Sequence, residues 1–323
     1  MWVFSLQRRQ EQVAAWQPKG FVVALVVLGI LLALPQFVYP VFLMKAMCFA
    51  LFACAFNLLL GFTGLLSFGH AAFFGSASYI SAYALKAWGL TPELAILLAT
   101  LNASVMGFLF AYVAIRRQGI YFAMITLALS QMVFFAALQF PFTGGEDGIQ
   151  GVPRGVLLGL IELTDNQSLY YFVLAIFLLG LYVVWRTIHS PFGQILKAIR
   201  ENEPRAMSLG YRVEYYKMIA FVISATLSGL AGGTKALVVQ VASLTDITWQ
   251  MSGEVVLMTL LGGMGTIFGP AVGAVMVMSL QNYLSWLGSW VTIIVGAIFV
   301  ICVLAFRRGV VGEILARWPQ RTR

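Results

Sequence analysis

Long apolar runs recur along almost the whole chain, and short polar or charged stretches separate them. A bilayer core takes about 20 consecutive apolar residues per helical crossing. The runs are continuous, whereas a strand of a membrane β-barrel alternates apolar and polar positions. The pattern therefore predicts an all-α polytopic membrane protein with about ten transmembrane helices. We expect the crossings at 20–39, 43–60, 68–86, 93–115, 119–140, 169–187, 214–236, 251–264, 267–286 and 289–306.

Three of the expected crossings, the second, third and eighth, are short or rich in glycine. Non-helical backbone at membrane depth is tolerated only where it is buried in protein or lines a water-filled cavity. We therefore expect broken or tilted helices among these three. The domain organisation that follows is a single transmembrane domain over 20–306, with a preceding segment 1–19 and a basic tail 307–323.

The charged residues lie in clusters between the apolar runs, and they set the expected orientation. Cytoplasmic loops of membrane proteins carry an excess of Lys and Arg. The segment 1–19, the Arg116–Arg117 turn, the loop 188–213 and the tail 307–323 all carry such an excess. With ten crossings all four fall on one side, so both termini are predicted to be cytoplasmic. The acidic, glycine-rich loop 141–168 is then the main outer loop.

Composition narrows the class of protein without changing this picture. Of the 323 residues, 61% are hydrophobic and only 10% are charged. Soluble domains average about 45–50% apolar and about 25% charged residues, and disordered chains are more polar still. Both classes are therefore excluded. The net charge of +8 comes from the loop clusters, so it reflects topology and does not indicate a nucleic-acid partner.

No enzyme motif is present in the sequence. The chain has no G-x-x-x-x-G-K-[ST], G-x-S-x-G or H-E-x-x-H sequence, and these are the patterns of phosphate-binding loops, serine hydrolases and zinc proteases. The three cysteines lie inside apolar runs without a histidine beside them, which supports neither a disulfide framework nor a zinc site. We expect no catalytic residues, no cofactor and no metal.

Polar residues inside the crossings are the candidates for a substrate pathway, because they are costly in lipid and usually face the interior of a helix bundle. The densest group lies in the glycine-rich stretch 61–70. Hydrogen bonding between closely packed helices explains such residues equally well. That structural role is favoured for His70, and snorkelling to the interface is favoured for Glu254. The candidates are Thr63, Ser67, His70, Thr126, Ser130, Gln131 and Glu254.

Three glycines, Gly265, Gly269 and Gly273, share one face of any helix that runs through all of them, because four residues separate each from the next. Small residues let helix backbones approach closely in membranes. We therefore expect this face to be a packing surface, within the chain or at a subunit interface.

The loop 188–213 contains the pattern of a short amphipathic helix. Ser190 and Pro191 are typical of helix starts, Pro204 interrupts the helix, and Gly210 is typical of a helix end. Such a helix on the cytoplasmic face can lie on lipid headgroups or dock onto a partner protein. Its expected apolar stripe is Ile195, Leu196 and Ile199. Its expected outward side is Lys197, Arg200 and Glu201.

Four segments resemble the LivM-type permease subunits of branched-chain amino acid ABC transporters. They are GFTGLLSFGHAAFFGSASY, TGGEDGIQGVP, SPFGQILKAIRENEPRAMSLGY and LLGGMGTIFGPAVGA, and they follow the family's order over most of the chain. The resemblance implies a multi-pass transport subunit of the bacterial inner membrane without its own ATPase site, since ATP is bound by partner subunits. It also implies a LivH-type second permease subunit, two cytoplasmic ABC ATPase subunits and a periplasmic substrate-binding protein.

The resemblance assigns the loop 188–213 to coupling with the ATPases. The residues that match the coupling segment of the family are Gly193, Ala198, Glu201, Asn202 and Gly210, and we add Arg200 to them. Leucine, isoleucine and valine are the favoured substrates, although urea and short-chain amide transporters have closely similar permeases. A self-contained ion-driven carrier or channel is the rival class, and it needs an ionisable relay in the membrane.

Overall fold

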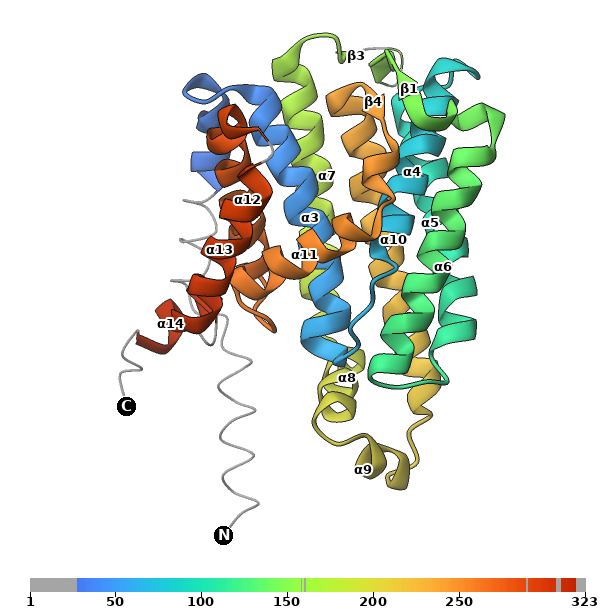
Figure 1. The fold of residues 1–323 in the computed structure, drawn as a ribbon, viewed down its shortest axis with the longest axis vertical. Coiled ribbons are helices and arrows are strands. Elements are labelled where there is room, and N and C mark those ends of the chain that lie inside the picture. The colour runs from blue at the N-terminus through green and yellow to red at the C-terminus, as the bar shows by residue number, and fades with distance from the viewer. Residues whose placement is uncertain (1–27, 158, 160, 289, 306–308, 318–323) are drawn as a thin grey trace.

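The computed structural model describes residues 28–157, 159, 161–288, 290–305 and 309–317. The expected segment 1–19 lies outside the described residues, as do residues 20–27 of the first expected crossing and parts of the tail 307–323. Helices dominate the described chain (Figure 1). Their bounds are α3 Pro40–Thr63, α4 His70–Lys86, α5 Pro92–Ala114, α6 Ile120–Gln139, α7 Asn166–His189, α8 Pro191–Glu201, α9 Glu203–Ser208, α10 Val213–Val239, α11 Trp249–Gly262, α12 Gly269–Leu284, α13 Trp290–Ala305 and α14 Gly309–Arg317.

Five helices of the described chain, α3, α5, α6, α7 and α10, are long and apolar enough to cross a membrane. Together they confirm an all-α, multi-pass membrane protein. Helices α4, α11, α12 and α13 have 17, 14, 16 and 16 residues. A helix of 14 residues rises about 21 Å, which is shorter than the bilayer core of about 30 Å. The count of ten crossings and the orientation of the termini stay predictions.

Two of the short helices follow irregular segments that turn back into the molecule. Residues 64–69 lead from the end of α3 into α4, and residues 240–248 lead from α10 into α11 (Figure 1). At these two crossings the helices are short and follow irregular backbone, but each is continuous within its own bounds. The expectation of a broken helix is wrong for the second crossing, because α3 is one continuous helix of 24 residues. Pro40 stands in its first turn, and it ends only at Gly64, whose φ of 79° few other residues adopt.

Polar caps and early prolines fix the other helix starts. Asp165 accepts a hydrogen bond from the Ser168 amide at the start of α7. Ser190 accepts one from the Gly193 amide at the start of α8, where Pro191 is the first helical residue. These are the residue types that satisfy or avoid the free amides of a first helical turn. The prediction that Ser190 and Pro191 start a short helix is therefore confirmed.

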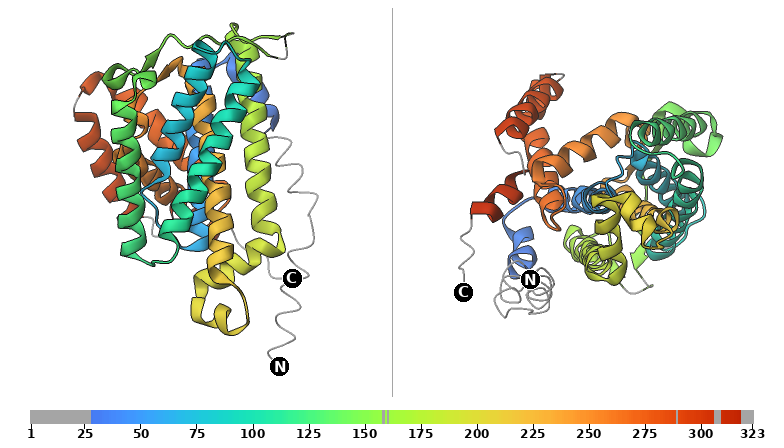
Figure 2. Two further views of the ribbon diagram at one scale, coloured as in Figure 1. Left: turned by 90° about the vertical axis from the view of Figure 1, so that its right-hand side faces the viewer. Right: turned by 90° about the horizontal axis from the view of Figure 1, so that it is seen from below.

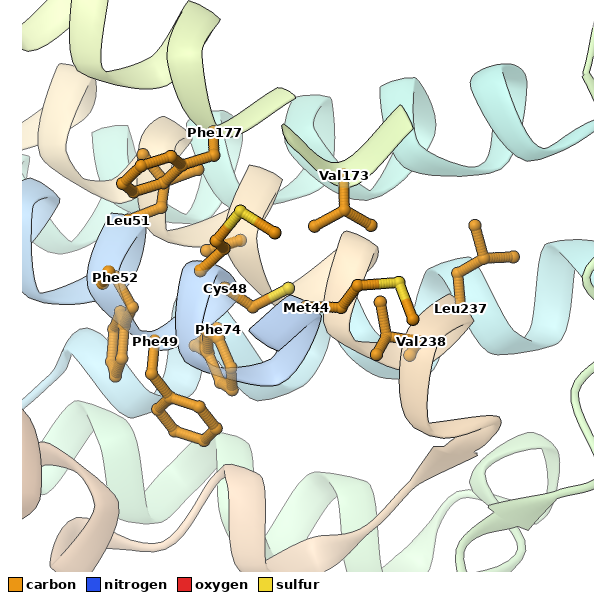
Figure 3. Packing of buried hydrophobic residues seen from close by; sticks show 14 of the residues in the cluster. Met44, Cys48, Phe49, Leu51, Phe52, Phe74, Val173, Phe177, Leu237 and Val238 are labelled. Carbon is orange, nitrogen blue, oxygen red and sulfur yellow. The ribbon is translucent and has the colours of Figure 1, made fainter. Parts of the chain in front are cut away.

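Helix α3 is the centre of the fold. Every residue from Ala46 to Leu59 is buried, and the largest apolar cluster packs α3 against α4, α7 and α10 (Figure 3). Within it the rings of Phe52 and Phe74 stack with their centroids 4.5 Å apart. The labelled members in Figure 3 are Met44, Cys48, Phe49, Leu51, Phe52, Phe74, Val173, Phe177, Leu237 and Val238.

The two ends of the bundle differ in structure. At one end lie α8 and α9 together with the turn between α5 and α6 that carries Arg116 and Arg117 (Figure 1). At the other end short strands pair antiparallel, β1 (Ile149–Gln150) with β4 (Val241–Ala242) and β2 (Val156–Leu157) with β3 (Ile161–Glu162). Helices α12 to α14 stand to one side of the bundle when it is seen from below (Figure 2).

Candidate functional site

The starts of α4 and α11 meet inside the molecule, and Ser252 joins them. The Ser252 hydroxyl accepts a hydrogen bond from the Ala71 amide at 3.0 Å and donates one to the Phe68 carbonyl at 2.8 Å. Ser252 lies in the first turns of α11, and its side chain is fully buried. A side-chain hydroxyl of α11 therefore binds the backbone at the start of α4. We call this contact the half-helix junction.

Two of the predicted pathway residues stabilise the irregular backbone beside the half-helix junction. Thr126 on α6 accepts a hydrogen bond from the Phe68 amide at 3.2 Å and donates one to the Ala123 carbonyl. Ser67 accepts one from the Gly69 amide at 3.2 Å. Both side chains are buried, where an unpaired amide costs about 1–3 kcal/mol. The structure thus brings Ser67 and Thr126 to one place although 58 residues separate Phe68 from Thr126.

His70, the first residue of α4, has a structural environment. Its Nε2 lies 2.8 Å from the Ser224 hydroxyl, which donates its proton to the Ala55 carbonyl. The imidazole must then be the donor to Ser224, because a hydroxyl has one proton. The rings of Phe56, Phe73 and Phe221 surround the imidazole with centroids 5.0, 5.6 and 5.7 Å away. A histidine held in this way fits the structural role better than a proton relay.

The remaining pathway candidates are spread over three helices. Ser130 on α6 is fully buried, and its hydroxyl has no hydrogen-bond partner among the described residues. Gln131 beside it and Glu254 on α11 are half-buried. Thr63 donates to the Leu58 carbonyl at the end of α3, so it belongs to the α8 end and not to the half-helix junction.

A second cluster of contacts lies at the α8 end, where the turn between α11 and α12 packs against α3. The Asn57 side chain donates to the Thr266 carbonyl at 2.8 Å and accepts from the Gly265 amide at 3.1 Å. Gly61 packs against the same turn so closely that a Cβ there would overlap the Gly265 amide. We call Asn57, Gly61 and the turn 263–268 the α8-end hub.

Arg200 links α8 to the α8-end hub. Its Nη1 donates to the Gly61 carbonyl at the end of α3 and lies beside Gly265. Its aliphatic stem packs over Gly64. Arg200 is exposed, as the amphipathic pattern predicts, and its long side chain still reaches the C-terminal end of α3 with its guanidinium. Lys197 also turns back, with its ammonium 5.8 Å from the centre of the Phe62 ring.

The other coupling residues shape α8 and α9. Leu196 and Ile199 are buried and Ile195 is half-buried, which confirms the predicted stripe. Asn202 caps α9 by accepting from the Arg205 amide, while Ala198 and Glu201 are exposed. Gly193 sits at the corner with α7, where a Cβ would overlap the Ile188 carbonyl. Gly210 follows α9 with φ of 88°, as expected for a helix end.

The predicted glycine face exists only in part. Gly269 and Gly273 lie in α12, and a Cβ at Gly273 would overlap the Met258 carbonyl of α11. Gly265 precedes the helix and has φ of 74°, so it is a turn residue and does not share that face. The packing surface of Gly269 and Gly273 is thus within the chain, against α11.

Sequence reasoning missed Asn57, Ser224, Ser252 and a buried ion pair. Each missed hydroxyl or amide is a polar residue within a predicted crossing, which was the usable signal. The ion pair joins Lys235 of α10 to Asp246 at 2.5 Å, and both side chains are almost fully buried. Asp246 also accepts from the Ser243 amide that precedes its 3-10 helix, η4 (Leu244–Asp246). Among the described residues no three His, Cys, Asp or Glu side chains group as a metal site requires.

Breaking this ion pair is expected to destabilise the fold. Asp246→Asn leaves the Lys235 ammonium buried without a counter-charge, which costs about 3–5 kcal/mol. Thermal unfolding of the purified protein should shift clearly downward, whereas Asp147→Asn, at an exposed loop position, should not shift it. The double variant Lys235→Met/Asp246→Leu should be more stable than Asp246→Asn. Equal melting of Asp246→Asn and the unaltered protein would show that the pair contributes nothing.

Known proteins are similar to this chain over most of its length. A family model described as "Branched-chain amino acid transport system / permease component" matches residues 40–303. The branched-chain amino acid transport permease LivM of Escherichia coli (strain K12) is 27% identical over 281 residues, which cover 80% of this chain and 66% of that protein.

Two relatives with other names show how wide the similarity is. The ribose import permease RbsC of Bacillus subtilis (strain 168) is 28% identical over 197 residues, covering 56% of this chain and 58% of that protein. A probable LivH permease of Methanocaldococcus jannaschii is 24% identical over 237 residues, covering 65% of this chain and 69% of that protein. No solved structure matches the chain significantly. From the family match, this chain belongs to the permease components of branched-chain amino acid transport systems.

Proposed function

We propose that this chain is a transmembrane permease subunit of an ABC importer for branched-chain amino acids in the bacterial inner membrane. It works with a LivH-type second permease, two cytoplasmic ABC ATPases and a periplasmic substrate-binding protein. In this proposal the chain crosses the membrane ten times, with both termini, α8 and α9 in the cytoplasm. The observation that carries the proposal is the match of residues 40–303 to the permease family, and the bond from Arg200 of α8 to the Gly61 carbonyl supports a coupling role for α8.

The α8–α9 end has the surface of a docking site. Met207 is 51% exposed and Leu209 is 69% exposed beyond the apolar bundle. An open recess of about 270 Å³ lies beside them, lined by residues 210–212, Tyr215 and Tyr216. The Lys217 ammonium holds the start of α9 through a 2.7 Å ion pair with Glu203. A helix that is fixed in place and carries exposed apolar side chains is suited to insert into a groove of a partner protein.

Force applied to α8 can reach the half-helix junction through named contacts. Arg200 bonds to the end of α3 and lies beside Gly265 in the α8-end hub, whose turn 263–268 directly follows the C-terminal end of α11. Ser252 at the other end of α11 holds the first turn of α4. Movement of α8 by an ATPase would therefore shift both half-helices, as alternating access requires.

The names of the relatives include different substrates, so the substrate class must be determined by experiment. A ribose permease is among them, and urea or short-chain amides stay the alternative substrates. An ion-driven carrier is disfavoured, because His70 is caged by aromatic rings and bonded to Ser224. Uptake of radiolabelled leucine, ribose and urea by the reconstituted complex separates these substrates. Uptake in vesicles that lack the ATPase would overturn the ABC proposal.

Copurification tests the docking surface. Met207→Asp/Leu209→Asp is expected to lower ATPase recovery with the permease about tenfold or more, because charged residues are disfavoured in the buried core of an interface. The matched control is Leu97→Asp/Leu101→Asp on α5, where the residues are 61% and 56% exposed but lie on a membrane-spanning helix. That control is expected to impair membrane insertion, with the ATPase still bound to whatever permease is assembled. Full ATPase recovery with the α9 variant would contradict the assignment.

A further inference from the structure

The loop 141–168 is bonded to the segment 240–248 that leads from α10 into α11. Strand β1 of the loop pairs antiparallel with β4 of the segment, at the end of the bundle opposite α8 (Figure 1). Gly148, just before β1, has φ of 68°, and a Cβ on it would overlap the Ala242 carbonyl oxygen. Few residues other than glycine adopt such a φ, so glycine here permits the two backbones to approach closely. We call residues 148–152 the strap.

Two side chains fasten the strap. Gln240, the residue after α10, donates from Nε2 to the Val152 carbonyl at 3.2 Å, and its own carbonyl accepts from the Val152 amide at 3.1 Å. Among the described residues, Gln240 is the one residue other than glycine with a positive φ, which is 59°. The Lys86 ammonium in the last turn of α4 donates to the Gln150 carbonyl at 2.7 Å. The strap is thus bonded to both α4 and the end of α10.

At η4 the segment is fixed more firmly than at the strap. The buried Lys235–Asp246 ion pair holds η4, and α4 packs against it so closely that a Cβ on Gly75 would overlap the Asp246 backbone. A pair of two-residue strands has little stability of its own, and the bond from Lys86 to Gln150 is exposed. The strap can therefore open while η4 stays in place.

We propose that the strap and β4 form the outer gate of the substrate pathway. The inference rests on the proposed function, which places this end of the bundle outside and the half-helix junction on the pathway. The segment that contains β4 leads to α11, where Ser252 binds the start of α4. In the closed gate, Ile149, Val152 and Ala242 are buried. Opening the gate separates β1 from β4 and exposes these side chains to the outer solution.

A reversible cross-link tests the gate. In a Cys302→Ala background, where the remaining cysteines Cys48 and Cys54 are buried, Gln150→Cys/Val241→Cys joins the strap to β4 across an opposed pair. Opposed residues of antiparallel strands have Cβ atoms about 4.5–5.5 Å apart, which is close to the span of a disulfide. Oxidation of the reconstituted complex is expected to lower leucine uptake about tenfold or more, and a reductant should restore it.

The matched control is Val156→Cys/Glu162→Cys. These opposed residues pair β2 with β3 inside the loop, so a disulfide between them does not tie the loop to α10 or α11, and oxidation should leave uptake unchanged. Unchanged uptake with the Gln150–Val241 pair linked, or failure of that pair to link, would overturn the gate alone. Lack of ATP-dependent leucine uptake by the unaltered complex would overturn the proposed function and the gate with it.

Thiol labelling measures how easily the gate opens. Ala242 is buried behind the strap, so Ala242→Cys in the same background should react slowly with a membrane-impermeant methanethiosulfonate added outside. Gln240→Gly tolerates the positive φ and removes the side-chain bond to Val152. It should raise the labelling rate about two- to tenfold, the effect of one hydrogen bond. Gln139→Gly, at an exposed glutamine that ends α6, should not raise it. Equal labelling rates in the two glycine variants would contradict the inference.

Discussion

Replacing Arg200 by glutamate is expected to reduce leucine uptake per ATP hydrolysed about tenfold or more in the assembled transporter. The guanidinium now donates to the Gly61 carbonyl at the C-terminal end of α3, and a hydrogen bond to a charged group contributes about 1.5–3 kcal/mol. A carboxylate in its place would face a carbonyl and the negative end of a helix, which is repulsive. The link from α8 to the α8-end hub would be lost while α8 itself remained.

The measurement is uptake and ATP hydrolysis in the same proteoliposomes. Arg186→Glu is the matched control, because Arg186 is exposed in the last turn of α7 and its replacement changes the net charge equally. Arg200→Lys should be intermediate, since lysine keeps the charge without the planar fork. An unchanged ratio of uptake to hydrolysis would contradict the prediction. Loss of the ATPases from the purified complex would contradict it differently, by showing that Arg200 is a docking residue.

The position of Arg200 shows where sequence reasoning stops. Capping residues and periodicity located α8 and its buried stripe, because both are local properties of about ten residues. The partner of Arg200 is a carbonyl 139 residues away, and helical periodicity cannot predict how a long side chain folds back. Glycine content marked the two crossings where the short helices α4 and α11 follow irregular backbone, but it misjudged α3. Gly61 there serves close packing on the turn 263–268 and not a break.

Polar residues in apolar runs were the correct type of candidate but not the complete set. Ser67 and Thr126 do lie together, whereas Asn57 and Ser252, which bond the interrupted backbone directly, were not selected. Each bonds to a partner that is distant in the sequence. Pairing of that kind depends on the tertiary arrangement, so the sequence marks a polar position without showing its partner.

Helix α11 is a short helix that connects the half-helix junction to the α8-end hub. It has 14 residues and is about 21 Å long. Ser252 near its start is bonded to α4, and Gly263 directly after its end packs against Gly309 of α14. A rod held at both ends transmits displacement with little loss, because packed interiors are stiff. The hub and the half-helix junction should therefore move together.

The contact between α4 and α10 is expected to be among the least tolerant in the described part of the fold, and Gly232→Ala tests it. A Cβ on Gly232 would overlap the Phe74 carbonyl oxygen and crowd the carbonyl carbon and Cα. These are backbone atoms of α4, so the two helices must separate to make room. Overpacking of this kind costs typically about 1–3 kcal/mol, occasionally more. Separation would also strain the His70–Ser224 bond, which joins the same helices.

Thermal unfolding of the purified transporter measures this cost. Gly232→Ala should lower the melting temperature and the yield of assembled complex. Gly296→Ala in α13, where a Cβ would meet no atom within 4 Å, should leave both unchanged or gain the roughly 0.5–1 kcal/mol that alanine adds to a helix. Gly180→Ala is the comparison for a clash with a side chain, because its Cβ would meet the Leu51 side chain. The second substitution Leu51→Ala should relieve that clash. No side-chain truncation can relieve Gly232→Ala, since its obstacle is the α4 backbone. Melting of Gly232→Ala at the temperature of the unaltered complex would show that α4 and α10 can separate freely, and the half-helix junction would then lack a fixed support.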